Sequence, residues 1–215
     1  MTDKILLHIC CAPCGCFPLN ELKKDGFEII LYWYNPNIHG LREYEKRLNT
    51  VRDFCKIQKC NIYEDKYDIK KWFKEIDDFT PAERCQKCWE MRLNKAAKTA
   101  AKSEIKFFTT TLLYSRFQDH NIIKNIGEAA GDKFGVEFLY SDFRKGWNEG
   151  IRDSKKMSFY RQQYCGCVFS EVERVNTQST ALPEGTKAQS SKGTKEINKN
   201  FVPMCLKYEQ CSVNI

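Results

Sequence analysis

The 215-residue sequence predicts an α/β fold, in which helices cover both faces of a mainly parallel β-sheet. Strand-like and helix-like segments alternate about five times between residues 5 and 140, as in chains whose parallel strands are joined by helical crossovers. The strand candidates are nearly continuous apolar runs, which is typical of strands buried on both faces. The helix candidates carry clear start and stop signals. We therefore expect a Rossmann-like three-layer domain followed by a C-terminal extension.

The first part of the chain contains three expected strands. An apolar run at residues 5–7 predicts the first, β-branched and aromatic residues 28–34 predict the second, and residues 61–63 predict a weak third. Expected helices cover residues 19–24, 41–57 and 68–75. In the longest of them the spacing predicts one apolar stripe and basic residues on the other faces. The stripe contains Leu41, Tyr44, Leu48, Val51 and Cys55, and the basic residues are Arg42, Lys46, Arg47 and Arg52.

The next segments continue the alternation. Thr80-Pro81-Ala82-Glu83 combines a capping Thr, a Pro at the first helical position and a Glu three residues after the cap, and predicts a helix to about residue 102. Residues 106–112 and 136–140 are expected strands. Residues 119–134 are an expected helix stopped by Gly135.

The C-terminal part changes in composition. Residues 146–164 are an expected helical or irregular stretch, and beyond Val175 the Thr-, Ser-, Pro- and Gly-rich composition is that of a linker. We therefore expect a folded α/β domain at residues 1–175 and a linker-like tail at residues 176–215. The sequence leaves open whether residues 201–206 pack against the domain.

Composition and charge limit the possible functions. No run of 18 apolar residues is present and the first residues lead straight into a strand, so neither a membrane span nor a signal peptide is expected. Twelve cysteines in a chain expected to be cytoplasmic, a reducing compartment, favour metal binding or redox catalysis over disulfides. A net charge of +7 fits a polyanion such as RNA, although a solvated basic surface is the simpler alternative.

The cysteines form three groups. Cys10 and Cys11 follow the first strand, Cys85 and Cys88 lie at a helix start, and Cys165-Gly166-Cys167 follows the last helical stretch. We expect the fold to gather them, because ligand sites form at the carboxyl ends of parallel strands. The spacing of the second pair puts both sulfurs on one helix face, where the helix N-terminus favours thiolate. Four thiolates suit either tetrahedral zinc or an iron–sulfur cluster. The adjacent Cys10 and Cys11 do not have the spacing that is typical of a zinc-binding cysteine pair.

The remaining thiols have other expected roles. A disulfide between Cys165 and Cys167 closes a very small ring, and strained disulfides are the easily reduced ones; two extra metal ligands are the alternative. Cys14 is a candidate ligand of a second metal, and Cys16 has no assigned role. Cys55 and Cys60 are expected in packing, and Cys205 and Cys211 lie in the tail.

A few polar residues complete the set of candidates. His8 is expected in the core, and His39 is expected at the same sheet edge as the cysteines. Asp142, after the last strand, is a candidate proton donor or metal ligand, with helix capping as the alternative. The segment Tyr160–Tyr164 mixes aromatic, cationic and amide side chains beside the Cys-Gly-Cys pair, which suits RNA binding.

Five motifs together resemble one known family. They are His8-Ile9-Cys10-Cys11-Ala12-Pro13-Cys14, Tyr34–His39 with Glu43–Arg47, Arg84-Cys85-Gln86-Lys87-Cys88, Phe108–Leu112 and Tyr160–Cys167. In this order over residues 4–170 they resemble the cobalamin-independent epoxyqueuosine reductases, the QueH family. Relatives often have a Pro after the Ser that follows the Thr-rich strand, where this chain has Ser115-Arg116-Phe117-Gln118.

The resemblance implies reduction of epoxyqueuosine to queuosine at the wobble position of tRNA. It implies a [4Fe-4S] cluster on Cys10, Cys11, Cys85 and Cys88. It also implies an adjacent mononuclear metal ion, expected to be iron, for which Cys14 and a nearby Asp are candidate ligands. The implied partners are tRNA carrying epoxyqueuosine and an electron donor that the sequence does not identify. A zinc-stabilised RNA-binding module and a tRNA-thiolating enzyme are the alternatives, although cysteines occupy the place of the latter's ATP-binding loop.

The expected chemistry follows from the electron count. Converting an epoxide to an alkene consumes two electrons and two protons and releases water. The resemblance implies a redox-active disulfide at Cys165 and Cys167, and this dithiol is expected to supply the electron pair. Asp142 is the expected acid for the leaving oxygen.

Overall fold

Five parallel strands form one sheet in the order β3-β2-β1-β4-β5. The structure, a computed structural model, describes residues 2–180, the last four by their backbone alone. The strands are β1 (Lys4–His8), β2 (Glu28–Trp33), β3 (Asn61–Glu64), β4 (Phe107–Thr110) and β5 (Glu137–Phe138). All four pairings are parallel, which confirms the predicted sheet.

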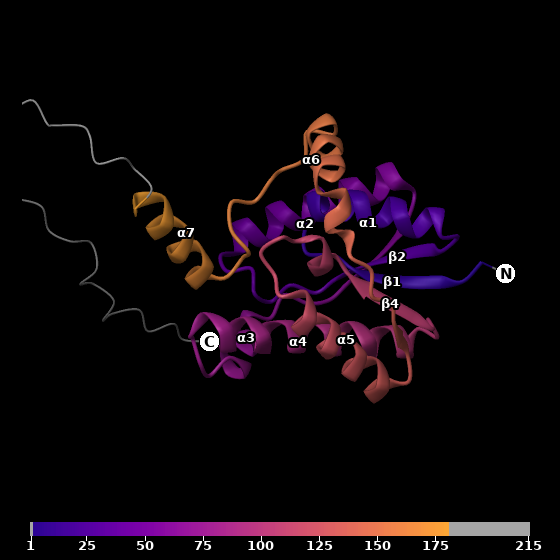
Figure 1. The fold of residues 1–215 in the computed structure, drawn as a ribbon, viewed down its shortest axis with the longest axis horizontal. Helices are drawn as coiled ribbons and strands as arrows, with labels where there is room; N and C mark the ends of the chain where they lie inside the picture. Colours follow the sequence, from indigo (N-terminus) through magenta and orange to yellow (C-terminus); the bar gives the residue numbers. More distant parts are fainter. Residues whose placement is uncertain (1, 181–215) are drawn as a thin grey trace, which may run out of the picture. The chain divides into compact units, whose positions relative to one another are not determined.

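Helices cover both faces of the sheet (Figure 1). One face carries α1 (Ala12–Lys24), α2 (Leu41–Gln58) and α6 (Trp147–Lys156), and the other carries α3 (Ile69–Glu75), α4 (Pro81–Lys102) and α5 (His120–Phe134). The predicted three-layer architecture is therefore confirmed.

The central strand β1 determines where a site can form. Ile5, Leu6 and Leu7 are fully buried, because β1 pairs with β2 on one side and with β4 on the other. The chain order reverses at this strand, since β2 and β3 extend the sheet in one direction and β4 and β5 in the other. In open parallel sheets the crevice at the carboxyl ends of such neighbouring strands is where ligands bind.

Helix α1 begins earlier than predicted. The expected helix covered residues 19–24, whereas α1 starts at Ala12, with Cys11 as the residue that caps it. Pro13 fits the first turn, where a backbone N–H is not needed. Gly15 lies inside the helix, at a point where a side chain would not fit, because a Cβ there would approach the Ile9 Cδ1 atom to 2.7 Å. The Pro and Gly interpreted as turn signals are therefore helical residues packed against the end of β1.

Other differences arise from tertiary contacts. Helix α2 has the predicted bounds within one residue, and four residues of the predicted apolar stripe are buried, namely Tyr44, Leu48, Val51 and Cys55. Leu41 differs because it is 57% exposed, and Arg47, expected on another face, is 2% exposed. The expected strand 106–112 ends at Thr110, whose hydroxyl accepts a hydrogen bond from the Leu112 N–H (3.1 Å) as the 3₁₀ helix η1 (Thr111–Tyr114) begins. A second 3₁₀ helix, η2 (Phe143–Gly146), follows β5.

The last described helix, α7 (Val168–Thr180), crosses the expected domain boundary at residue 175. Its final residues were expected to be linker but have helical backbone. The expected docking segment 201–206, Cys205 and Cys211 lie outside the described residues. Over residues 2–180, no helix combines the length and the apolar character needed to cross a membrane.

Candidate active site

Three thiols lie together where β1 passes into α1. The Sγ atoms of Cys10, Cys11 and Cys14 lie within 4.8 Å of one another, a spacing at which three thiolates can hold one metal ion. The Thr111 hydroxyl donates to Cys10 Sγ (3.2 Å), and the Gln162 side-chain amide donates to Cys11 Sγ (2.8 Å). Cys14, the candidate ligand of a second metal, thus lies with the other two.

Mutual contact shifts the pKa values of these thiols in opposite directions. Hydrogen bonds from the Cys11 and Cys14 thiols, with the Arg92 charge and the Thr111 hydroxyl, hold the pKa of Cys10 well below its ordinary value. Burial raises the pKa of Cys11, and hydrogen bonding to Cys10 and Cys11 raises that of Cys14. The neighbouring groups therefore favour the thiolate form at Cys10 and oppose it at Cys11 and Cys14.

The second cysteine pair lies in the first turns of α4. Cys88 is buried beside Trp72, Ile76 and Cys167 in a small apolar cluster, and Cys85 is half-buried. The expected thiolate-favouring effect of the helix N-terminus does not dominate, because burial raises the pKa of both thiols. The Arg84 guanidinium nonetheless approaches Cys85 Sγ at 3.8 Å.

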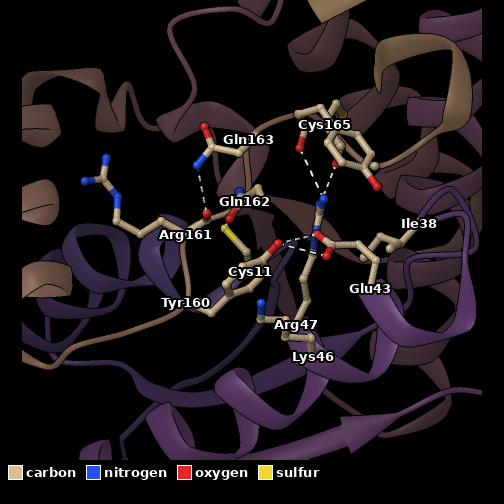
Figure 2. A network of polar contacts seen from close by, with 12 residues as sticks. Cys11, Ile38, Glu43, Lys46, Arg47, Tyr160, Arg161, Gln162, Gln163 and Cys165 are labelled. Atoms are coloured by element: carbon tan, nitrogen blue, oxygen red, sulfur yellow. Dashed lines mark hydrogen bonds and ion pairs between the residues drawn. The ribbon is translucent and has the colours of Figure 1, made fainter. Parts of the chain in front are cut away.

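The third group, Cys165-Gly166-Cys167, is held from α2 by the buried Arg47 (Figure 2). The guanidinium of Arg47 donates to the carbonyl oxygens of Cys165 (2.8 Å) and Tyr164 (3.3 Å) and forms an ion pair with Glu43 (2.7 Å). The Tyr160 hydroxyl also donates to Glu43 (2.8 Å). This network positions the backbone of Cys165.

Gly166 cannot be replaced by another residue without strain. Its φ is +151°, and a Cβ would lie 2.9 Å from the Asn37 side-chain nitrogen. Its carbonyl accepts a hydrogen bond from the His39 backbone N–H (2.9 Å). The loop after β2, which includes Asn37 and His39, therefore packs directly on the Cys-Gly-Cys backbone.

The Cys165 thiol interacts with both other groups. Cys165 lies at an exposed edge of the loop, yet the protein surrounding its sulfur raises its pKa to about 12. Burial is the largest cause, and the charges of Cys88, Cys167 and Cys10 raise the pKa further. The thiol of Cys85 likewise interacts with that of Cys167. Among the described residues, only Cys10, Cys11 and Cys14 group within 4.8 Å, while Cys167 packs in one buried cluster with Cys88 and Gln162 links the Cys-Gly-Cys loop to Cys11.

Arg92 is a functional residue that the sequence reasoning missed. Its side chain is 1% exposed, and its charge acts on Cys10, Cys88 and Cys165. One nitrogen donates to the Asn35 side-chain oxygen (2.7 Å), whereas Nε and Nη1 have no hydrogen-bond partner within residues 2–180. The signal was its spacing, because residues 85, 88 and 92 lie on one helix face.

Asp142 occupies the helix-capping position that the sequence offered as the alternative to a proton donor. Its carboxylate caps η2 by accepting from the Arg144 backbone N–H (3.0 Å) and forms an ion pair with the Arg144 guanidinium (2.6 Å). The hydrogen bond from the Arg144 side chain is the main reason that its pKa falls to about 2. Asp142 is therefore ionised near neutral pH, and it is not among the grouped metal-ligand candidates of the described residues.

The histidines are neutral structural residues. His8 is in the core as predicted, where its ring contacts the Thr110 hydroxyl at 2.8 Å and burial lowers its pKa to about 3. His39 lies at the site edge as predicted. Burial lowers its pKa to about 4, and its Nδ1 accepts a hydrogen bond from the Val168 N–H at the start of α7 (3.1 Å).

A polythiol site at the point where a parallel α/β sheet reverses its order defines a metal-dependent or redox enzyme. The family model described as "Epoxyqueuosine reductase QueH" matches residues 5–173. The chain therefore belongs to the QueH family and is an oxidoreductase, as the sequence resemblance predicted. An RNA-binding module without catalysis, one of the alternatives, is wrong.

Three relatives illustrate the similarity. A protein of Dehalococcoides mccartyi called epoxyqueuosine reductase QueH is 37% identical over 175 residues, 81% of this chain and 96% of its own. Proteins of the same name from Thermotoga maritima (37% identical, 79% of this chain and 91% of its own) and Haemophilus influenzae (38%, 78% and 71%) are also similar.

One solved structure shares the fold. The U34-tRNA thiolase NcsA from Methanococcus maripaludis, solved with its [4Fe-4S] cluster, superposes with a TM-score of 0.52 at 14% identity. The alignment covers 83% of this chain and 66% of the thiolase. At this identity the likeness concerns the fold alone.

Proposed function

We propose that this chain reduces the epoxide of epoxyqueuosine at the wobble position of tRNA to give queuosine, with an iron–sulfur cluster and a Cys165/Cys167 dithiol. The observation that carries the proposal is that Cys167 shares a small buried cluster with Cys88, while Gln162 on the same loop donates a hydrogen bond to Cys11 Sγ (2.8 Å). It joins the dithiol to the two cysteine pairs in one site. Residues 1–175, with the remainder of α7, form the catalytic domain in this proposal.

Cys10, Cys11, Cys85 and Cys88 would hold a [4Fe-4S] cluster. Two features of the site fit such a group, which is anionic when bound by four thiolates. The buried Arg92 has two guanidinium nitrogens without a partner among the described residues, and hydrogen-bond donors approach Cys10, Cys11 and Cys85. When bound, the cluster supplies one-electron transfer and Lewis acidity.

Cys14 would serve an adjacent single iron. The support is its closeness to Cys10 and Cys11, which puts a fifth thiol beside the proposed cluster ligands. The ligands of a single ion lie close together, whereas the cysteines of a cluster bind different irons. The two sets therefore have different geometric requirements.

The dithiol balances the reaction. Oxidation of Cys165 and Cys167 to a disulfide releases two electrons and two protons, and the epoxide accepts both to give an alkene and one water. Each of the two thiols contributes one electron and one proton. Asp142 is not required as an acid, and an external two-electron reductant must restore the dithiol before the next turnover.

The test is a single-turnover reaction. Anaerobic, iron- and sulfide-loaded protein is reduced, freed of reductant and mixed with an excess of tRNA containing epoxyqueuosine, and the nucleosides are then analysed. We expect up to one queuosine per chain, together with the loss of two titratable thiols. Cys165→Ser is expected to yield none.

Cys60→Ser is the matched control. Cys60 Sγ contacts Cys55 Sγ (3.4 Å) just before β3, at the amino end of the sheet, so its loss is expected to leave the yield unchanged. No queuosine from the unmodified chain, even with continuous reductant, would refute the function. Full single-turnover yield from Cys165→Ser would refute only the dithiol.

A further inference from the structure

We infer that the loop of residues 115–118, together with the adjacent aromatic pair Tyr114 and Trp147, binds an unpaired nucleobase of the tRNA anticodon loop. In this inference, the base stacks on the Phe117 ring. The inference rests on the proposed function, because it names how that substrate is held. It assigns an RNA contact to residues that lie beside the thiols but include none of them.

A small cavity connects this region to the thiols. Its volume is about 110 Å³, and its lining includes Cys14, Gln162, Tyr114, Trp147 and Arg161. Sites that enclose whole drug-sized ligands have volumes of roughly 300–1,000 Å³. The cavity therefore admits only a small group carried by the base, so the nucleotide itself must lie on the rim.

Stacked aromatic side chains form one wall of the cavity. The rings of Tyr114 and Trp147 stack with centroids 5.2 Å apart and planes 25° from parallel. The Tyr114 hydroxyl donates to the Trp147 carbonyl oxygen (2.8 Å), which fixes η1 against the start of α6. The rim is therefore built on a rigid base.

Phe117 lies on this base and faces solvent. Its ring meets the edge of Trp147 at a centroid distance of 6.3 Å, yet Phe117 is 82% exposed. Other exposed phenylalanines of the described residues are better covered, since Phe73 packs on His39 and Phe79 packs on Phe169. An aromatic ring held in solvent contributes little to folding but offers a face on which a base can stack.

Cationic side chains beside Phe117 point to a nucleic acid as the ligand. The Arg116 guanidinium lies over the Trp147 ring, 5.1 Å from its centroid, and the exposed Arg161 lines the cavity. An aromatic face next to guanidinium groups is the combination that binds single-stranded RNA, through base stacking and phosphate contacts. An apolar partner would not need these charges.

The test compares two RNA probes that lack epoxyqueuosine. One is an anticodon stem-loop with an unmodified guanosine at the wobble position, and the other is a blunt duplex of equal length. Binding to the cluster-loaded full chain is measured by fluorescence anisotropy. Phe117→Ala is expected to weaken stem-loop binding by about 5-fold to 150-fold, the range for the loss of one base stack, and to leave duplex binding unchanged.

Conservative replacement and a matched control exclude a structural effect. Phe117→Trp is expected to bind the stem-loop within about 3-fold of the original, because any aromatic face can stack. Tyr63→Ala removes another exposed aromatic, on the edge strand β3, and is expected to change neither probe. With epoxyqueuosine tRNA, Phe117→Ala is expected to raise KM by the same factor as the loss of binding, with kcat unchanged.

Three results would overturn the inference. The first is equal stem-loop binding by Phe117→Ala and the original chain, and the second is an equal loss of affinity for stem-loop and duplex. The third is a concentration-dependent dimer that disappears in Phe117→Ala, which would assign the rim to a second copy of the chain. Failure of the proposed function is separate. If the original chain binds the stem-loop through Phe117 but produces no queuosine, the reductase proposal fails and the RNA site stands.

Discussion

Replacing Arg47 with Met tests whether the Cys-Gly-Cys loop depends on a buried cation in α2. The Arg47 side chain is 1% exposed in its 2.7 Å ion pair with Glu43, and it also holds two carbonyl oxygens of the loop. Met preserves most of the apolar stem, so the main loss is the charge. Removing one partner of a buried pair costs about 3–5 kcal/mol, because the other charge is left uncompensated.

Denaturant unfolding followed by circular dichroism measures this cost. For a domain of this size it corresponds to a melting temperature lower by about 6–20 °C. Arg47→Met is also expected to lower single-turnover yield, because the backbone of Cys165 is no longer held. Iron and sulfide contents are expected to stay the same, since Arg47 does not bond to the side chains of the proposed cluster ligands.

Arg52→Met is the matched control on the same helix. Arg52 pairs with Glu64 at 2.5 Å, but the two side chains are 46% and 30% exposed, and solvent-screened pairs contribute only about 0–1 kcal/mol. Equal loss of stability in Arg47→Met and Arg52→Met would refute the structural role of Arg47. Unchanged single-turnover yield in Arg47→Met would refute its role in placing Cys165.

Other consequences can be tested separately. Cys85→Ala is expected to abolish acid-labile sulfide, whereas Cys14→Ala should keep the sulfide and lose about one iron per chain; equal losses would contradict separate sites. Burial lowers the pKa of His8 to about 3, so between pH 6.5 and pH 3 the unfolded chain takes up a proton that the native chain does not. The free energy of unfolding should therefore fall by up to about 1.4 kcal/mol for each unit by which the pH is lowered in this range. His8→Gln should reduce that slope, measured by urea unfolding, and an unchanged slope would contradict it. Gly166→Ala should cost about 1–3 kcal/mol from backbone strain and lower single-turnover yield, and wild-type stability would show that the loop tolerates a side chain.

The fold was predictable because its signals are local. The runs at β1 and β2 are apolar on both faces, and the Asp119 cap and Gly135 stop of α5 lie where the sequence places them. The start of α1 was not predictable from Pro13 and Gly15 alone. Both residues fit a turn equally well until contacts from Ile9 and α2 select the helix.

The site was predictable in its cysteines and not in its cations. The end of the first strand identified Cys10 and Cys11, and the close spacing of their cysteines identified the other two groups. The burial of Arg47 depends on a loop 117 residues away, and no periodicity in α2 distinguishes it from the exposed Arg52. The sequence could not separate the two candidate roles of Asp142, because its contacts with Arg144 form only where the chain turns into η2.

Two of the buried arginines, Arg47 and Arg92, explain how so many thiols can share one edge of the sheet. Bringing several thiolates together in a region of low dielectric is unfavourable unless a charge of opposite sign is near. In the metal-free protein, burial keeps most of these thiols protonated, and Arg92 stabilises negative charge at Cys10. In the proposed function, metal binding would displace the remaining protons, and the bound group would provide an anionic partner for the Arg92 Nε and Nη1 atoms, which have none within residues 2–180. Arg47 acts differently, because Glu43 already neutralises it and its remaining donors hold the carbonyl oxygens that place Cys165. One cation therefore prepares the site for an anionic group, and the other fixes the loop that must meet it.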